Sequence, residues 1–165
     1  MIPIVSIVGK SNVGKTTFLE KVVRELKSRG YRIATIKHDA HSFEIDHEGK
    51  DSWRHKQAGA RTTIISSAEK LAMVTDTDHD QTLDEIREQY MRDVDIIISE
   101  GYKREKHPKI EVFRQEKYPE LLCSDDDNLL AIAGDPQNAP DGVPRFPLND
   151  AAPICSFLEE RFLKE

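Results

Sequence analysis

The sequence predicts an α/β protein with a doubly wound, mostly parallel sheet, and three observations predict it. Short apolar runs alternate with amphipathic segments, a glycine-rich segment directly follows the first apolar run, and a later apolar run ends in an acidic residue and a glycine. Alternating strands and helices are typical of a parallel sheet covered by helices on both faces. At 165 residues, the chain is long enough for one domain with a buried core.

The glycine-rich segment GKSNVGKT, residues 9–16, fits the phosphate-binding loop pattern G-x-x-x-x-G-K-[ST] at every fixed position. The apolar, β-branched run 2–8 before it predicts a buried strand. Four apolar residues after it recur at the spacing of one helix face: Leu19, Val22, Val23 and Leu26. A strand, a glycine loop and a helix N-terminus direct backbone N–H groups at an anion. We therefore expect a fold of the P-loop NTPase type, with residues 1–165 as a single nucleotide-binding domain.

This P-loop supplies the expected nucleotide-binding residues, which are Gly9, Asn12, Val13, Gly14, Lys15, Thr16 and Thr17. The glycines permit a tight turn and close approach of the backbone to phosphate. Lys15 can reach the β and γ phosphates, and the Thr16 hydroxyl can bind Mg²⁺. Lys10 resembles the extra lysine in the loop of dimeric P-loop ATPases. Because Ser-Asn follows it instead of the usual Gly-Gly, we interpret Lys10 as an exposed loop lysine.

The later apolar run spans residues 94–101 and ends in Ser99, Glu100 and Gly101. It resembles a Walker B strand, whose acidic residue lies at the carboxyl end of a central strand, where ligands bind in such sheets. We predict that Glu100 is the catalytic residue, which would hold Mg²⁺ through water or orient an attacking water. The alternative is a strand-end carboxylate in solvent.

The other elements follow in order. Strands are predicted over residues 31–37, 62–66, 71–74, 110–113 and 129–133, and helices over residues 51–60, 82–91 and 151–162. Capping residues are predicted at Gly30, Asp51 or Ser52, Thr82 with Glu85, and Asp150. Residues 136–147 hold four prolines and predict an irregular connection.

Residues 38–50 form a long polar segment, and a loop of this length in a compact domain is usually functional. Asp46 is its best candidate for Mg²⁺, with Asp51 and Ser52 nearby. The predicted metal ligands are therefore Thr16, Asp46 and Glu100. The segment also carries His38, His41 and His47, but this is no standard zinc spacing and no cysteine lies near, so a protein-only metal site is disfavoured.

Composition and charge exclude several classes of function. The chain has 24 basic and 30 acidic residues and a formal net charge of −6, which argues against broad nucleic-acid binding. No apolar run is long enough for a membrane span and no signal peptide is recognisable, so we expect a cytoplasmic protein. Cys123 and Cys155 lie far apart in the sequence and outside any C-x-x-C motif, which is typical of reduced thiols. A disulfide between these two cysteines is the alternative. Residues 103–109 are rich in lysine and arginine and form either a solvated loop or a contact for a second anion.

The nucleotide base is not identified by a motif. The guanine-reading pattern N-K-x-D is absent, and Asp135, after the strand 129–133, could offer a carboxylate to a guanine edge. These residues alone leave GTP and ATP both open.

The pattern as a whole resembles the molybdopterin-guanine dinucleotide biosynthesis adaptor family, MobB. The matching segments are residues 9–17, 35–38, 45–46, 49–52, 58–60 and 99–103. Their order and spacing match over residues 2–113, and more weakly to residue 150. The family commonly shows K-H-x-H-H and P-G-K-D-S, where this chain has Ala40 for the second histidine and Glu48 for the proline.

The resemblance implies a homodimer that binds GTP and Mg²⁺ and hydrolyses GTP slowly. Its implied partner is the guanylyltransferase that attaches GMP to molybdopterin, with molybdopterin or its guanine dinucleotide as a further ligand, and neither nucleic acid nor membrane. We expect a weak intrinsic GTPase whose main role is binding, because no arginine finger is evident in the chain. The alternatives are a small-molecule kinase that uses ATP and a GTP-dependent nickel metallochaperone.

Overall fold

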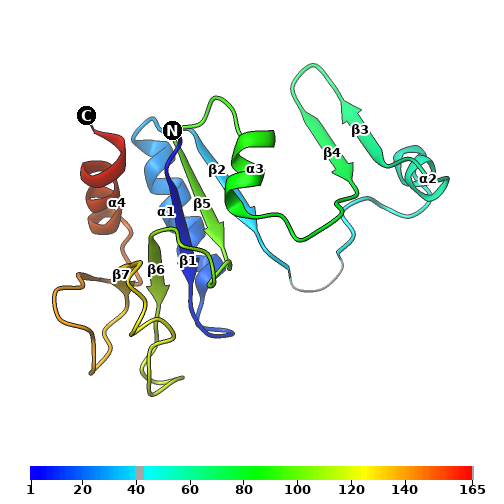
Figure 1. Cartoon of the computed structure of the whole chain (residues 1–165). Coiled ribbons are helices and arrows are strands. Elements are labelled where there is room, and N and C mark those ends of the chain that lie inside the picture. The colour runs from blue at the N-terminus through cyan, green and yellow to red at the C-terminus, as the bar shows by residue number, and fades with distance from the viewer. Residues whose placement is uncertain (40–42, 165) are drawn as a thin grey trace. The chain divides into compact units, whose positions relative to one another are not determined.

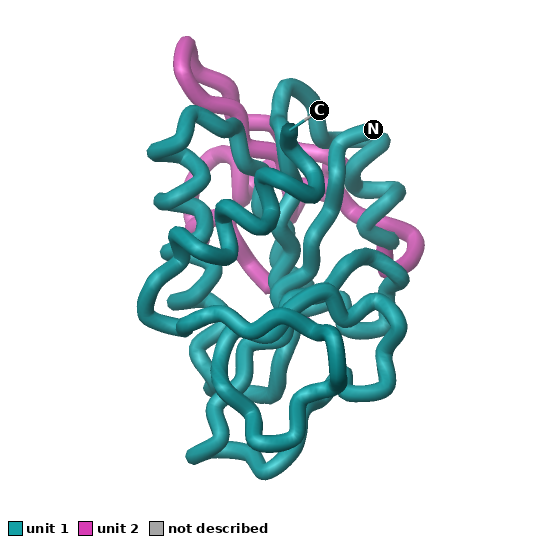
Figure 2. The backbone as a smooth tube through the Cα atoms, turned by 90° about the vertical axis from the view of Figure 1, so that its left-hand side faces the viewer, with its two compact units in different colours: residues 1–38, 82–165 teal, residues 39–81 magenta. Residues whose placement is uncertain are grey.

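The computed structural model describes residues 1–39 and 43–164, and the chain divides into two compact units (Figure 2). The first unit combines residues 1–38 with residues 82–165, and the second spans residues 39–81. His41, one of the three histidines of the polar segment, lies outside the described residues. The single domain expected over residues 1–165 stays a prediction.

The first unit is built on a parallel sheet of six strands in the order β2-β5-β1-β6-β7-β8 (Figure 1). Its strands are β1 (Ile4–Val8), β2 (Ile33–Lys37), β5 (Ile96–Glu100), β6 (Lys109–Val112), β7 (Leu129–Ala133) and β8 (Arg145–Phe146). The sequence pattern predicts five of these strands to within two residues at either end. It misses β8, because two residues in a proline-rich connection carry no alternation that could mark a strand.

Helices cover both faces of this sheet, which confirms the doubly wound prediction. Helices α1 (Lys15–Ser28) and α4 (Ala152–Leu158) share the largest buried cluster with one face, and α3 (Leu83–Tyr90) packs with Ile4, Ile36 and Ile97 on the other. A π-helical turn, η1 (Glu159–Leu163), continues α4. The fully buried face of α1 consists of Phe18, Val22 and Leu26. The predicted face is therefore rotated slightly, because Leu19 and Val23 are only partly buried.

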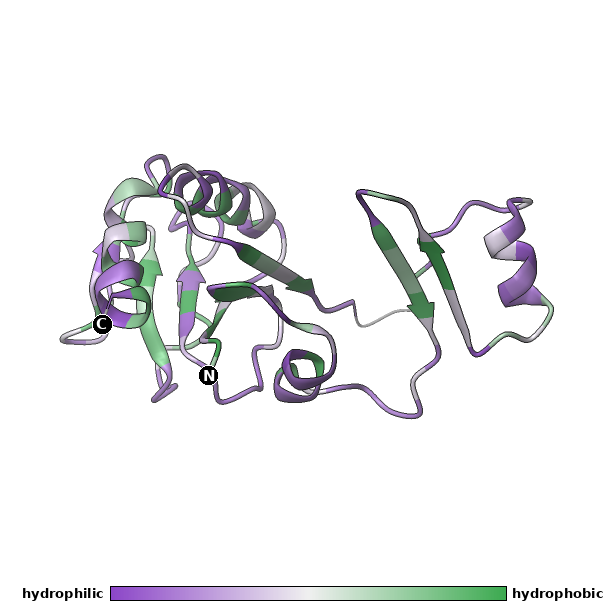
Figure 3. Ribbon diagram, turned by 90° about the horizontal axis from the view of Figure 1, so that it is seen from above, coloured by the Kyte–Doolittle hydropathy of each residue, from purple (hydrophilic) through white to green (hydrophobic). Residues whose placement is uncertain are grey.

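The second unit contains helix α2 (Asp51–Gln57), which contacts β3, and an antiparallel pair of strands, β3 (Thr62–Ser66) and β4 (Leu71–Thr75). Both strands are predicted from the sequence, but they form a sheet of their own. Four large apolar side chains of this pair are more than a third exposed: Ile64, Ile65, Leu71 and Met73. Figure 3 shows the corresponding hydrophobic colour on both arrows.

The helix ends test the predicted caps. Thr82 and Glu85 form the expected capping box on α3, and Gly30 follows α1 in a left-handed conformation with φ 94°. Asp150 accepts a hydrogen bond from the N–H of Ala152 in the first turn of α4. The predicted cap of α2 is wrong, because its N-cap residue is Lys50 and no side chain caps it.

The two cysteines are free and buried. Burial raises the pKa of the Cys123 thiol to about 11 and that of the Cys155 thiol to about 12. Both thiols are therefore poor nucleophiles in the folded protein at neutral pH.

Arg29 joins the end of α1 to the C-terminal helix. Its guanidinium donates hydrogen bonds to Glu159 at 2.5 Å, to Glu25 at 2.6 Å and to the carbonyl of Ala152 at 3.0 Å. The side chains of Arg29 and Glu159 are only 20% and 12% exposed, so this ion pair is screened weakly by water.

We expect Arg29→Met to lower the free energy of unfolding by about 2–4 kcal/mol, because the buried Glu159 carboxylate would lose its cationic partner and keep only its hydrogen bond with Tyr31. The control is Arg24→Met on the same helix, where the arginine side chain is 74% exposed and the loss should stay within about 0.5 kcal/mol. Urea unfolding followed by circular dichroism measures both values. Equal losses of unfolding free energy for the two variants would contradict the expected contribution of the Arg29 contacts to stability.

Candidate nucleotide-binding site

The P-loop connects the end of β1 at Val8 to the start of α1 at Lys15, so the predicted order of strand, loop and helix is confirmed (Figure 1). Strand β1 lies between β5 and β6, and all three are parallel. The loop therefore emerges at the carboxyl edge of the sheet, where parallel α/β sheets bind ligands.

Two glycines are required by the path of this loop. Gly9 has φ 144°, and a Cβ atom there would lie 2.5 Å from the carbonyl oxygen of Val112 in β6. Gly14, the N-cap residue of α1, has φ 97°. Asn12 adopts φ 59°, a left-handed conformation that asparagine tolerates better than most residues. The loop thus curls tightly and runs directly against β6.

Lys15 lies inside the curl. Its ammonium group donates to the carbonyl oxygens of Gly9 at 3.2 Å and Lys10 at 3.0 Å. The backbone N–H groups of Asn12, Val13 and Gly14 have no acceptor within the described part of the chain. Backbone N–H groups, an ammonium and a helix N-terminus are the groups that bind anions in phosphate-binding loops, and the nucleotide-binding role of these residues stays a prediction.

Thr16 and Glu100 come together from α1 and β5. The Thr16 hydroxyl lies 2.9 Å and 3.0 Å from the two carboxylate oxygens of Glu100. An octahedral Mg²⁺ ion holds its oxygen ligands at about 2.0–2.1 Å, which sets neighbouring ligands about 2.9 Å apart. The separation of the hydroxyl and the carboxylate is that of a hydrogen bond and equals that of two adjacent ligands of such an ion, and the role of Thr16 and Glu100 as metal ligands stays a prediction.

A cavity of about 440 Å³ opens over this arrangement and is lined by Ser11, Asn12, Gly14, Lys15, Thr16, Thr17 and Glu100. Six of these seven residues are among those expected to bind nucleotide or Mg²⁺. The side chain of Val13 is 1% exposed and packs in the core, so Val13 can offer only its backbone to a ligand. Asp46 belongs to the second unit, where its carboxylate accepts the N–H of His47 at 2.8 Å, and its role as a metal ligand stays a prediction.

His38 follows β2 and is the histidine of the polar segment that belongs to the first unit. Its backbone N–H donates to the carbonyl of Glu100 at 3.0 Å, and its ring lies 4.7 Å from the ring of Tyr102. Within residues 1–39 and 43–164, no group of three or more His, Cys, Asp or Glu side chains could hold a metal ion.

Asp135 lies at the carboxyl ends of β7 and β8, on the same edge of the sheet as the P-loop. Its carboxylate is paired with Arg145 at 3.2 Å and is 91% exposed. A shallow cavity of about 360 Å³ is lined there by Gly134, Asp135 and residues 145–148. Lys21 of α1 donates to the carbonyl of Leu148, which joins this region to the helix of the P-loop.

Sequence reasoning missed three residues of the site: Arg114, Lys117 and Tyr118. All three donate hydrogen bonds from their side chains to carbonyl oxygens of the P-loop. They follow β6, more than 100 positions after the loop, and carry no motif of their own. The parallel pairing of β6 with β1 would have indicated the proximity, but not the contacts.

The basic segment 103–109 is not wholly solvated. Lys109 is buried and forms an ion pair with Asp126 at 2.7 Å, and His107 lies 3.5 Å from Asp84. The alternative of a fully solvated loop over residues 103–109 is therefore wrong at these two positions, because one side chain turns into the core and the other packs beside α3.

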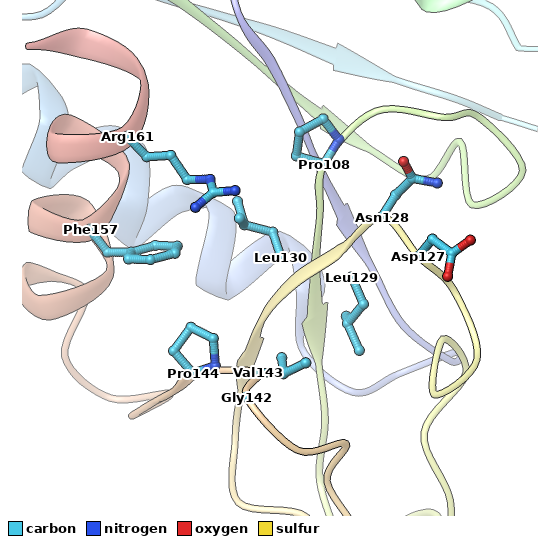
Figure 4. A pocket seen from close by; sticks show the side chains of 10 residues that line it. All are labelled: Pro108, Asp127, Asn128, Leu129, Leu130, Gly142, Val143, Pro144, Phe157 and Arg161. Carbon is cyan, nitrogen blue, oxygen red and sulfur yellow. The ribbon is translucent and has the colours of Figure 1, made fainter. Parts of the chain in front are cut away.

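A cavity larger than that at the P-loop lies at the opposite, amino ends of the strands, and Figure 4 shows the side chains that line it. It has a volume of about 610 Å³ and is lined where the chain enters β6, β7 and β8, and by the C-terminal helix. Leu130, Phe157 and Pro144 form apolar walls, with Arg161 beside them. Because ligands of parallel sheets bind outside the carboxyl ends of the strands, the smaller P-loop cavity is the better candidate for the nucleotide.

The family model described as molybdopterin guanine dinucleotide synthesis protein B matches residues 4–135. The molybdopterin-guanine dinucleotide biosynthesis adapter protein of Haemophilus influenzae is 39% identical over 164 residues, covering 96% of this chain and 88% of the relative. The adapter protein of Escherichia coli is 35% identical over 174 residues, covering 100% and 96%. This chain belongs to the MobB family. The crystal structure of Bacillus subtilis MobB superposes with a TM-score of 0.77 at 28% identity, covering 99% of this chain and 100% of that one. No described helix is long and apolar enough to cross a membrane.

The region matched by the MobB model takes in the P-loop, Glu100 and Asp135, as well as the segment with Arg114, Lys117 and Tyr118. It ends before α4. The P-loop cavity and the three side chains that contact the P-loop therefore lie in the part of the chain that the family model matches.

We expect Gly9→Ala to destabilise the protein by about 2–4 kcal/mol, because the new methyl group would collide with the Val112 carbonyl and the backbone would be strained. Gly30→Ala is the matched control. Gly30 also has positive φ, but a Cβ there meets nothing within 4 Å, so only the backbone strain of about 1 kcal/mol applies. Thermal and urea unfolding of both variants measure the difference, and a smaller loss for Gly9→Ala than for Gly30→Ala would refute the close-contact explanation.

Proposed function

We propose that this protein is a GTP-binding adaptor in the biosynthesis of molybdopterin guanine dinucleotide, with slow Mg²⁺-dependent GTP hydrolysis. The main supporting observation is the P-loop cavity, in which free backbone N–H groups and Lys15 face Thr16 and Glu100. The relatives named as adapter proteins support the pathway.

In the proposed mode of binding, the N–H groups of residues 12–14 and the first turn of α1 hold the triphosphate oxygens. Lys15 exchanges its two carbonyl partners for the β and γ phosphates, which are stronger acceptors because they are charged. Thr16 and Glu100 hold Mg²⁺, which would neutralise phosphate charge when bound. Glu100 also orients the attacking water.

Slow hydrolysis follows from the composition of the cavity lining. Lys15 is the one cationic side chain among the residues that line it. An arginine that stabilises the transition state of phosphoryl transfer contributes about 10³–10⁵ in rate. Arg114 lies beside the P-loop but does not line the cavity, and its Nε donates to the Val13 carbonyl and its Nη1 to Glu116.

The preference for GTP is supported by Asp135. Guanine presents two adjacent N–H donors on its Watson–Crick edge, and a carboxylate accepts both, whereas adenine offers an acceptor at the corresponding ring nitrogen. Asp135 lies at the carboxyl edge of the sheet and is tied loosely to a single arginine, which leaves carboxylate lone pairs available.

The proposed partner is the guanylyltransferase that attaches GMP to molybdopterin, in the cytoplasm, and molybdopterin or its guanine dinucleotide is a further proposed ligand. The proposed assembly is a homodimer. The exposed apolar residues of β3 and β4 support it, because a two-stranded sheet is marginal alone and exposed apolar patches mark interaction sites.

Two other functions are alternatives to this proposal. A small-molecule kinase that uses ATP would transfer the γ-phosphoryl group to an acceptor and release ADP. Free phosphate formed from GTP in buffer without an acceptor therefore separates the proposed function from a kinase. A GTP-dependent nickel metallochaperone would bind nickel stoichiometrically, which calorimetry of the apoprotein measures directly. Membership of the MobB family favours the adaptor over both.

We expect Lys15→Ala to weaken GTP binding about 10–150-fold, because a charge-assisted contact to the phosphates is lost. Titration calorimetry with GTP and ATP gives the affinities of the variant and the wild type, and the wild type should prefer GTP. Lys27→Ala is the matched control, since Lys27 is an exposed lysine at the other end of α1. An unchanged dissociation constant for folded Lys15→Ala would rule out the P-loop as the nucleotide site.

We expect Glu100→Gln to reduce GTP turnover by about 100-fold while changing GTP affinity much less. The amide keeps the size of the side chain but removes the negative charge that would orient water and balance Mg²⁺. Phosphate release at saturating Mg²⁺ measures turnover, and Glu88→Gln, a 75% exposed carboxylate of α3, is the control. Equal turnover in Glu100→Gln and wild type would assign Glu100 a structural role only.

A further inference from the structure

Three side chains from one segment after β6 donate hydrogen bonds to three successive carbonyl groups of the P-loop. Tyr118 donates its hydroxyl to the carbonyl of Ser11 at 3.0 Å, and Lys117 donates its ammonium to the carbonyl of Asn12 at 2.6 Å. Arg114 donates Nε to the carbonyl of Val13 at 3.0 Å. We call residues 114–118 the brace segment.

These contacts fix the direction of the neighbouring N–H groups. In a planar trans peptide, the C=O of one residue and the N–H of the next point in opposite directions. The brace segment holds the carbonyls of residues 11, 12 and 13 toward itself. The N–H groups of residues 12, 13 and 14 therefore point away from the brace segment. These are the same three N–H groups that have no acceptor among the described residues.

The brace segment is itself firmly anchored. The N–H of Phe113 donates to the carbonyl of Ala133 at the end of β7. The chain also packs closely at Gly134, where a Cβ atom would lie 2.3 Å from the carbonyl oxygen of Phe113. The N–H groups of Lys117 and Tyr118 both donate to the carbonyl of Arg114, which closes a tight turn. Tyr118 also packs against two buried clusters, so its hydroxyl is presented from a rigid ring.

In a fourth contact, a side chain of the P-loop lies over a side chain of the brace segment. The ammonium of Lys10 lies 5.1 Å from the centre of the Tyr118 ring, a cation–π distance. The lysine after the first glycine, interpreted from the sequence as an exposed loop residue, therefore helps to join the P-loop to the brace segment.

We propose that Arg114, Lys117 and Tyr118 are positioning residues, which hold the P-loop carbonyls outward so that its N–H groups are preorganised for the phosphates of a nucleotide. The proposal rests on the proposed triphosphate binding. Preorganisation matters because donors that are already aligned bind without the entropic cost of ordering a flexible loop. The brace residues contact the loop from behind and do not line the cavity.

The first test compares phosphate-containing probes of different size. Lys117→Ala should weaken binding of GTP, ATP and inorganic triphosphate by the same factor, about 5–30-fold, because the brace acts on the phosphate cradle and not on the base. Tyr118→Phe, which removes a single hydroxyl, should weaken all three by about 2–10-fold. Lys117→Arg should restore binding to within about 3-fold of wild type.

Controls separate positioning from charge and folding. Lys27→Ala makes the same change of charge on an exposed lysine remote from the P-loop and should leave all affinities unchanged. Lys117→Ala should melt within about 2 °C of wild type without nucleotide, because its lysine is exposed. Unchanged affinity in Lys117→Ala, a loss confined to GTP, or an equal loss in Lys27→Ala would each overturn the proposal.

A second readout needs no nucleotide. The ¹⁵N order parameters of Asn12, Val13 and Gly14 should be near 0.85 in the wild type and fall below about 0.6 in Lys117→Ala. Unchanged order parameters would overturn the brace even if affinity fell. Wild-type protein that binds no triphosphate would instead refute the proposed function, and the order parameters would still test whether the brace holds the loop.

Discussion

The parallel pairing of β1 with both β5 and β6 is the constraint on which the site depends. In this register Ile7 lies beside Glu100 and Val8 lies beside Glu111. The end of β1 is therefore flanked by the end of β5, which supplies Glu100, and by the end of β6, which leads to the brace segment. The P-loop has the candidate metal ligand on one side and its anchors on the other because the strand order places them there.

Polar groups buried beside this edge maintain the arrangement. Ser99 donates its hydroxyl to Ser6 across the β1–β5 pair at 2.8 Å, in a part of the core where both side chains are fully buried. The Glu111 carboxylate accepts the N–H groups of Leu122 and Cys123. Burial raises the pKa of Glu111, although these two hydrogen bonds act against the shift. A buried carboxylate is tolerated because it satisfies two backbone donors of the segment that follows the brace.

These contacts explain how the connection between β6 and β7, which has no regular secondary structure, supports the P-loop. Glu111 fixes residues 122–123, and Leu121 packs with Phe113 and Ile132 in a small buried cluster. Tyr118 lies against the same cluster. The rigidity of the core is thus transmitted through the connection between β6 and β7 to the carbonyls of Ser11, Asn12 and Val13.

The sequence predicts what local spacing encodes. The P-loop, the strand that ends at Glu100 and the capping box at Thr82 each lie within about ten consecutive residues, and the structure confirms their positions. Each brace contact joins two residues that are separated by 101 to 107 positions in the sequence, so no local periodicity could reveal these contacts. The burial of Lys109 was missed for a related reason, because its partner Asp126 lies on another connection and both residues look solvated in isolation.

The distribution of cationic groups relates this geometry to the proposed adaptor role. Lys15 is inside the cavity, whereas Arg114 and Lys117 lie behind the loop with their donors bound to its backbone. Interactions of this kind favour the bound triphosphate and its transition state about equally, because they respond to the position of the phosphates and not to charge that develops during cleavage. Uniform binding increases affinity without accelerating the chemical step. In the proposed adaptor, a nucleotide held in this way would persist long enough to be presented to a partner. Faster hydrolysis would require a cationic group that enters the cavity from outside the described lining.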